Sequence, residues 1–361
     1  MRSRLEGGYL LLLQRAERSL FIWLLLSPLV LLSIFFRFVL FVRRSLFVLL
    51  RRTRKVSAPI ITVGNVTVGG TGKTPFILSL LAHLDKGQKI AYVSRGYRRE
   101  IKGLRVGYQF DPKEIGDEAS LIQRRNNSVL VGICDDKWKA IQALDGKVDL
   151  IILDDGLQRY DIPIDYKVAT VDCLSPDGFG WLLPRGLLRE SFSRLKEADI
   201  LILTNGIDAQ TIERTKEKVA PFHRSTIVTR PTITQFFTSD GNPYSLLTTT
   251  PVALLSSIAH PERFFFSMRQ AGYTVVERLE LSDHLDIKDE KLIQWADRIQ
   301  ALHKEVVIVA TEKDWARKAT WPSLSVPLLF SHLELEIVEG KKEFDALIDQ
   351  LRTMACACEQ I

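Results

Sequence analysis

The chain has 361 residues, of which 46% are hydrophobic and 25% charged, which excludes a disordered, collagenous or disulfide-rich scaffold. At about 150 residues per domain, this length predicts two domains. The net charge of +6 would suit a nucleic-acid partner if the charge were spread over the whole protein.

The positive charge is concentrated at the N-terminus. Residues 1–55 hold eleven basic and two acidic side chains, a net charge of +9, so residues 56–361 carry −3. A slightly acidic body disfavours nucleic acid as a partner, because phosphate backbones bind to basic surfaces.

The same basic segment is also the most apolar part of the chain. Residues 20–36 contain no charged side chain, a length of about 25 Å as a helix, at the lower limit for crossing a bilayer. Six of the 18 phenylalanines lie in residues 1–55 among arginines, as at a lipid headgroup boundary. We expect a membrane-associated arm that either spans the bilayer or lies in its interface, with the remaining chain in the cytoplasm. A signal peptide and a buried core helix are the alternatives.

Short apolar runs alternate with helical stretches from residue 58 onward, which is typical of a parallel sheet with helices on both faces. In chain order, we predict strands at 60–63, 90–94, 129–133, 148–153, 168–171 and 200–204, and helices at 74–84 and 136–144. A second set comprises strands at 252–256, 275–279 and 306–310 and helices at 261–271 and 341–354. The predicted organisation is an arm (1–55), an α/β core (56–230) and a second, smaller α/β domain (231–361).

A glycine-rich loop between the first predicted strand and helix is the most specific motif. It reads Thr67, Val68, Gly69, Gly70, Thr71, Gly72, Lys73 and Thr74. In a P-loop, backbone N–H groups cradle the phosphates, the lysine reaches the β- and γ-phosphates, and the hydroxyl binds Mg²⁺. We therefore predict a P-loop NTPase-like core. Thr67 replaces the usual first glycine, so we expect Gly69 and Gly70 to supply the flexibility; a glycine-rich turn without a ligand is the alternative.

Two carboxylates, Asp154 and Asp155, follow an apolar strand. In parallel sheets, ligands gather at the carboxyl ends of the strands, where a Walker B acid would hold Mg²⁺. A surface turn is the alternative interpretation.

Other P-loop classes fit less well. Residues 311–314 differ from the guanine-binding motif of GTPases, and Val68 stands where MinD-type ATPases carry an additional lysine.

Further short segments follow the loop in a fixed order. Besides 64–75, they are 94–97 (SRGY), 116–118 (GDE), 154–158 (DDGLQ), 188–190 (LRE), 258–261 (IAHP), 263–265 (RFF), 283–284 (DH) and 311–314 (TEKD). Together they resemble tetraacyldisaccharide 4'-kinase, the lipid A kinase of Gram-negative bacteria, over roughly residues 1–315.

The resemblance implies a kinase that transfers the γ-phosphate of ATP to the 4'-hydroxyl of a tetraacylated glucosamine disaccharide 1-phosphate. It implies Mg²⁺ as cofactor, a P-loop core, a smaller α/β domain and an N-terminal membrane-associated helix. We expect a monomer at the cytoplasmic face of the inner membrane, with the lipid A precursor and the lipid surface as partners.

Site residues are also implied by the resemblance. Asp117 matches the general base and His284 the histidine that assists it, while Lys73 and Arg189 lie at the phosphates. The implied metal ligands are Thr74, Asp154, Asp155, Gln158 and Glu190. A hydroxyl is a poor nucleophile, so a carboxylate that accepts its proton is chemically reasonable.

Alternatives to these roles are open at this stage. Asp117 also reads as a helix N-cap, His284 as a surface or capping histidine, and Arg189 as a solvated side chain. The chain departs from the family pattern at Arg159 and Leu285, where the family usually has histidine. A membrane-docked P-loop ATPase that acts as a switch or insertion factor is the alternative function.

Overall fold

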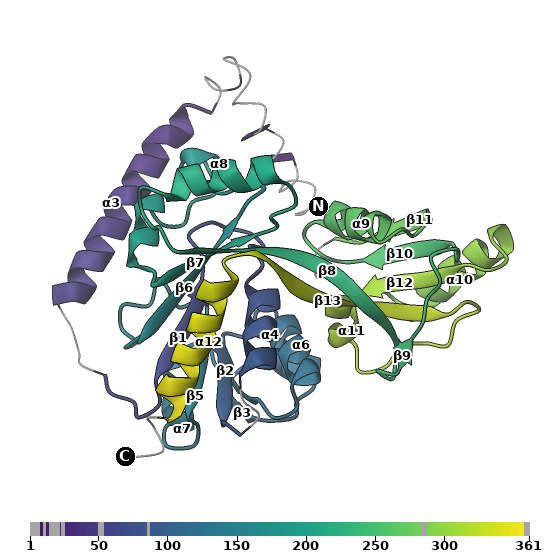
Figure 1. Cartoon of the computed structure of the whole chain (residues 1–361), viewed down its shortest axis with the longest axis horizontal. Helices are drawn as coiled ribbons and strands as arrows, with labels where there is room; N and C mark the ends of the chain where they lie inside the picture. The colour runs from purple at the N-terminus through teal and green to yellow at the C-terminus, as the bar shows by residue number, and fades with distance from the viewer. Residues whose placement is uncertain are drawn as a thin grey trace. The chain divides into compact units, whose positions relative to one another are not determined.

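The structure, a computed structural model, describes residues 8, 9, 12, 13, 22, 26–49, 54–84, 87–282 and 287–356 (Figure 1). Contacts divide the chain into a first unit (Met1–Val93, Lys137–Arg230 and Ile337–Ile361) and a second unit (Ser94–Asp136 and Pro231–Glu336). The chain passes from the first unit to the second after Val93 and again after Arg230. This grouping differs from the expected segments because the last helix returns to the first unit, while residues 94–136 join the second.

The first unit holds most of the predicted core elements. They are α3 (Pro28–Leu49), β1 (Ile60–Gly64), α4 (Lys73–His83), β2 (Ile90–Ser94), α7 (Lys137–Leu144), β5 (Leu150–Asp154), β6 (Tyr166–Asp172), the 3-10 helices η1 (Gly178–Gly180) and η2 (Phe192–Glu197), β7 (Ile200–Thr204), α8 (Ala209–Val219), the start of β8 (Thr226–Thr238), the end of β13 (Leu328–Glu339) and α12 (Lys341–Cys356).

A parallel sheet forms the centre of this unit, with the strand order β8-β7-β6-β1-β5-β2. Its apolar strands are buried on both faces, as expected when helices cover a parallel sheet. In the register, Val63 of β1 lies opposite Asp154 of β5. The loop after β1 and the acidic pair at the end of β5 therefore emerge side by side.

Helices from both ends of the chain pack in the first unit. Leu201 and Leu203 of β7 belong to one apolar cluster with Ile212 of α8, and Phe36 and Leu40 of α3 pack against it. In contrast, α12 packs on α4, where the rings of Phe344 and Phe76 meet edge to face at 6.4 Å between centroids. This contact explains why the last helix belongs with the first unit. The α/β class with a parallel-dominated sheet is thus confirmed.

Helix α3 contains part of the apolar arm expected from the sequence. The buried Ser33 hydroxyl donates to the Leu182 carbonyl (2.6 Å) and accepts from the Arg185 N–H (3.1 Å), which fixes the helix to the body of the first unit. Pro28 begins this helix, where a proline is tolerated. None of the helices described in the structure is both long and apolar enough to cross a membrane.

The second unit is also α/β. Its elements are β3 (Arg105–Gly107), α5 (Pro112–Ile115), α6 (Asp117–Arg125), β4 (Leu130–Ile133), β9 (Pro243–Tyr244), β10 (Val252–Ser256), α9 (Pro261–Gln270), β11 (Val275–Glu280), α10 (Asp289–Leu302), β12 (Val307–Thr311) and α11 (Glu312–Arg317), with the remainder of β8 and β13. Strands β11, β10, β12 and β13 are parallel neighbours in that order, while β9 pairs with β8 and β3 with β4 in antiparallel fashion.

A buried carboxylate links two helices of the second unit. Arg125, the last residue of α6, donates to Glu312 Oε2 at 2.6 Å and lies 3.0 Å from Nδ1 of His332. Burial raises the pKa of Glu312 to about 7, although the Arg125 charge opposes the rise. Burial, helped by the same arginine, lowers the pKa of His332.

Replacing Glu312 with glutamine is expected to change how stability depends on pH. The pKa of Glu312 in the folded chain lies above its ordinary value of 4.5, so the folded state favours the protonated carboxyl. The resulting contribution to folding stability is fully present below pH 4.5 and is lost as the pH rises through about 7. Relative to Glu312→Gln, the wild-type chain should therefore lose a few degrees of melting temperature between about pH 5 and about pH 8. Circular dichroism melts measure this difference, with the exposed Glu305→Gln as control. Parallel pH profiles of wild type and Glu312→Gln would contradict the prediction.

Candidate active site

The loop between β1 and α4 depends on glycine at defined positions. Gly72 caps α4 with φ +77°, and a Cβ there would lie 3.0 Å from Cγ2 of Thr204. Gly69 has φ +111°, a conformation that other residues rarely adopt. The first N–H groups of any helix have no intrahelical acceptor, so the start of α4 offers donors for an anion.

Residues 187–189 hold the first half of this loop in an extended conformation. The Val68 N–H donates to the Leu187 carbonyl (2.7 Å), the Arg189 N–H donates to the Val66 carbonyl (2.8 Å), and Thr67 forms an antiparallel bridge with Leu188. Thr67, which replaces the usual first glycine, therefore sits in strand-like pairing that needs no glycine. Gly69 adopts a positive φ, which glycine allows at no steric cost.

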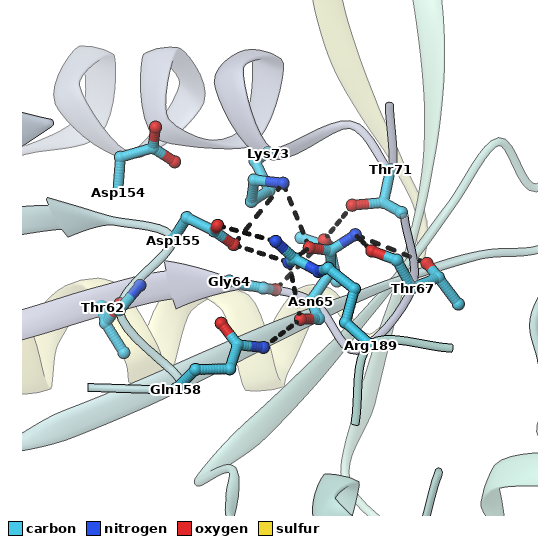
Figure 2. Close-up of polar contacts among 12 residues, drawn as sticks. Thr62, Gly64, Asn65, Thr67, Thr71, Lys73, Asp154, Asp155, Gln158 and Arg189 are labelled. Carbon is cyan, nitrogen blue, oxygen red and sulfur yellow. Dashed lines mark hydrogen bonds and ion pairs between the residues drawn. The ribbon is translucent and has the colours of Figure 1, made fainter. Parts of the chain in front are cut away.

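Asn65, the residue that follows β1, connects the groups around the loop (Figure 2). Its side chain is fully buried, and its amide donates to the Thr67 carbonyl at 2.8 Å. The amide oxygen accepts from Lys73 Nζ (3.2 Å) and from Nη2 of Arg189. The backbone carbonyl accepts from Gln158 Nε2 (2.9 Å) and again from Arg189 (3.1 Å). The buried Asn65 side chain thus orients Lys73 and Arg189 and also bonds to the loop at Thr67.

Lys73 and Arg189 also share the carboxylate of Asp155. Arg189 donates to its two oxygens at 2.8 and 2.9 Å, and Lys73 Nζ lies 3.9 Å from Oδ1. Burial raises the pKa of Asp155, but the Arg189 hydrogen bond and the charges of Lys73, Arg189 and Lys137 outweigh it, so the pKa lies well below its usual range. Asp155 is therefore ionised and holds both cations beside the glycine-rich loop.

Asp154, the last residue of β5, is oriented differently from its neighbour. Figure 2 shows the Asp155 side chain turned toward Arg189 and the Asp154 carboxylate turned away from it. Tyr92 donates to Asp154 Oδ2 at 3.2 Å. The buried Lys137 donates to the backbone carbonyls of Asp154 and of Asp155, the latter at 3.0 Å, and fixes the strand end.

Side-chain oxygens near the loop are the groups that could bind Mg²⁺. No cluster of three or more His, Cys, Asp or Glu side chains that could hold a metal is found among the described residues. Mg²⁺ on a nucleotide needs only one or two protein oxygens, because phosphates and water complete its octahedron. The Thr74 hydroxyl in the first turn of α4 and the Asp154 carboxylate are oxygen donors of this kind. Asp155 is bonded to Arg189 in this structure, and its role as a metal ligand stays a prediction.

Two other residues with an implied metal role have different surroundings. Gln158 presents its amide nitrogen to the Asn65 carbonyl. Glu190 is buried, lines a small cavity with Arg194 and Lys167, and has a pKa raised by burial despite the Arg194 charge. Their metal-binding role stays a prediction.

The implied base belongs to the second unit. Asp117 is the first residue of α6, and Gly116 with φ +81° takes the N-cap position, so interpreting Asp117 as the N-cap was wrong. Arg317 Nε donates to Asp117 Oδ2 at 2.8 Å. His284 and Leu285 lie outside the described residues. Arg159, the other departure from the family pattern, is paired with Asp161 at 2.7 Å.

Sequence reasoning assigned no role to Asn65, Tyr92, Lys137 or Arg317. A signal existed for Asn65, because a polar residue directly after a buried strand lies at the carboxyl end of the sheet. Lys137 and Arg317 carried no comparable signal, since their partners are distant in the sequence. The interpretation of Arg189 as a solvated side chain was wrong, because it is bonded to Asp155 and Asn65.

Asn65→Ala is expected to weaken ATP binding. Lys73 and Arg189 would lose a shared acceptor and would have to be ordered when the nucleotide binds. A hydrogen bond to a charged group contributes roughly 1.5–3 kcal/mol, so the Kd for ATP should rise at least about tenfold. Titration calorimetry measures the Kd, melting curves check folding, and the exposed Asn242→Ala is the control. An unchanged Kd in folded Asn65→Ala would refute this role.

Comparison with known proteins places the chain in a family. The sequence profile of "Tetraacyldisaccharide-1-P 4'-kinase" matches residues 23–353. A tetraacyldisaccharide 4'-kinase of Shewanella sp. (strain W3-18-1) is 34% identical over 302 residues, 81% of each chain. One from Halothermothrix orenii is 27% identical over 343 residues, covering 87% of this chain and 88% of the relative.

A solved structure has the same fold. It is a crystal structure of LpxK from Aquifex aeolicus in complex with ATP, with a TM-score of 0.71 and 24% identity, covering 91% of this chain and 99% of that one. The profile match and the extent of the similarity show that this chain belongs to the tetraacyldisaccharide-1-P 4'-kinase family.

Proposed function

We propose that this chain transfers the γ-phosphoryl group of ATP to the 4'-hydroxyl of a tetraacylated glucosamine disaccharide 1-phosphate, a step of lipid A biosynthesis. The observation that carries this proposal is the convergence of Lys73 and Arg189 on Asp155 beside the glycine-rich loop. Membership of the family supports the identity of the acceptor.

The loop and its cations supply what phosphoryl transfer requires. Charge develops on the transferred group and on the leaving oxygen, so catalysis depends on positioning and on charge neutralisation. The backbone of residues 67–74 would hold the phosphates, Lys73 would contact the β- and γ-phosphates, and Arg189 would add a second positive charge. Both cations are already oriented by Asp155 and Asn65, which reduces the cost of ordering them.

A Mg²⁺ ion fits this arrangement through Thr74 and Asp154. When bound, it would neutralise phosphate charge and orient the nucleotide. Asp154 is held for this by the Tyr92 hydroxyl and by the fixed end of β5. Asp155 would act indirectly, through the two cations that it holds.

Asp117 is the proposed general base, and His284 the proposed residue that assists it. The carboxylate would accept the proton of the 4'-hydroxyl as the bond to phosphorus forms. Its side chain is half-buried and oriented by Arg317, as a base that acts in a defined direction requires.

Replacing Asp117 by asparagine should abolish most phosphate transfer to the lipid while sparing ATP binding. General base catalysis contributes about 10²–10⁴-fold, and kcat should fall by that order. The assay follows radiolabelled phosphate from ATP into the disaccharide lipid, with the exposed Asp240→Asn as control.

The same assay separates the kinase from a switch ATPase. A kinase consumes ATP appreciably only when the lipid acceptor is present. Acceptor-independent hydrolysis without a phosphorylated lipid would favour the switch ATPase, and a normal rate in Asp117→Asn would refute the base role alone.

We further propose that α3 binds the cytoplasmic surface of the inner membrane, in keeping with a lipid substrate. Exposed apolar side chains follow one another along this helix, including Phe35, Phe38 and Phe41 at 64%, 61% and 67% exposure. Arg43 and Arg44 lie on the same helix, where their charge would attract anionic headgroups. An interfacial helix of this kind needs no span across the bilayer.

The double variant Phe38→Ser, Phe41→Ser is expected to bind vesicles more weakly. Each buried phenylalanine contributes about 1.5–3 kcal/mol, so partitioning onto vesicles containing phosphatidylglycerol should fall at least about tenfold. Co-sedimentation measures the bound fraction, and Phe266→Ser, at 60% exposure in the second unit, is the matched control. Equal loss in the control, or no loss in the double variant, would contradict a role for α3.

A further inference from the structure

Arg317 contacts the carboxylate that the proposed function makes the general base. Its Nε donates to Asp117 Oδ2 at 2.8 Å, although the two residues are 200 positions apart in sequence. The side chain of Arg317 is 5% exposed and that of Asp117 is 18% exposed. A shielded ion pair of this kind has a defined geometry, unlike most pairs at the surface.

The guanidinium group of Arg317 is itself held in place on its other side. Its Nη1 donates to the Ser257 carbonyl at 2.8 Å and to Asp314 Oδ1 at 3.0 Å. Asp314 is fixed in turn by the Thr311 hydroxyl (2.6 Å) and by the Ser257 N–H (3.2 Å). A planar guanidinium held at Nη1 directs Nε in one direction, and here that direction is toward Asp117.

Two further arginine side chains at the end of α6 contact α11 and the residue that follows it. Arg124 donates to the carbonyls of Trp315 (2.9 Å) and Lys318 (2.6 Å), and Arg125 donates to Glu312 (2.6 Å). These bonds fix the end of α6 opposite Asp117. Bonds other than the Arg317–Asp117 pair therefore also hold α6 beside α11, while Arg317 contacts the Asp117 side chain at the start of α6.

We propose that Arg317 is a positioning residue of the reaction, which orients the Asp117 carboxylate for the proton of the acceptor hydroxyl. This inference rests on the proposed function, because Asp117 must be the base. Ser257 and Asp314 provide the support that keeps the guanidinium in place. Lysine would keep the charge of Arg317 but offers a point donor, so it would not hold Asp117 and the Ser257–Asp314 pair in one rigid geometry.

A double-mutant cycle in the lipid phosphorylation assay tests the proposal. Small displacements of a catalytic group cost up to about 10²-fold, so Arg317→Lys should lower kcat by about ten- to a hundredfold with the KM for ATP nearly unchanged. In an Asp117→Asn background, Arg317→Lys should have almost no further effect, because the group that it orients is already absent. Arg298→Lys, an exposed arginine paired with Glu277 in the same unit, should retain full activity.

A purely structural role of Arg317 gives different results. The same fold-loss of kcat in both backgrounds, or full activity of Arg317→Lys in a chain that needs Asp117, would overturn the positioning role alone. A wild-type chain that transfers no phosphate to the lipid would overturn the proposed function and this inference with it. Melting curves of each variant identify losses that arise from unfolding, and the charge-conserving lysine is chosen because it is the replacement that disturbs this buried site least.

Discussion

The candidate active site depends on the ion pairs that the Asp155 carboxylate forms with Lys73 and Arg189. Lys73 begins a helix and Arg189 lies in a loop, and two cations this close would repel each other without an anion between them. Asp155 lies between them because the β1–β5 register places Val63 opposite Asp154, so the acidic pair emerges beside the glycine-rich loop. The fully buried Asn65 then accepts from both cations and fixes their direction. Lys73 and Arg189 are therefore already oriented beside the glycine-rich loop, the proposed phosphate site.

The second unit, like the first, contains a carboxylate paired with an arginine. There too a carboxylate, that of Asp117, is held by an arginine from a distant part of the chain, and the arginine is fixed by Ser257 and Asp314. In the first unit a carboxylate orients the two cations proposed to bind phosphate, whereas in the second an arginine orients the carboxylate proposed to accept a proton. This division suits a kinase, which must neutralise charge on one substrate and deprotonate the other.

Sequence reasoning was most successful where a local pattern decides the structure. The buried strands β1, β2, β5 and β7 are short apolar runs, and the start of α4 follows from its glycine-rich loop, so their positions were predicted to within a few residues.

The long strands β8 and β13 were missed, because they are buried unevenly along their length and carry no continuous apolar run. Helix α6 was missed for a similar reason, since four of its nine residues are charged. Asp154 and Asp155 were identified together, but their different orientations depend on Arg189 and Tyr92, which are remote in sequence. The expectations of a monomer and of a role for His284 stay predictions.

The central claim is that the loop of residues 67–74 binds the phosphates of ATP, with Lys73 and Arg189 as the cations that contact them. A crystal structure of the chain with Mg²⁺ and a non-hydrolysable ATP analogue tests this claim most directly. We expect the triphosphate against the backbone N–H groups between Gly69 and Lys73, with Lys73 Nζ in hydrogen-bond distance of the β- and γ-phosphates and Asn65 still in contact with the lysine. A nucleotide bound elsewhere, or one whose phosphates leave Lys73 and Arg189 on Asp155 without contacting either cation, would contradict it.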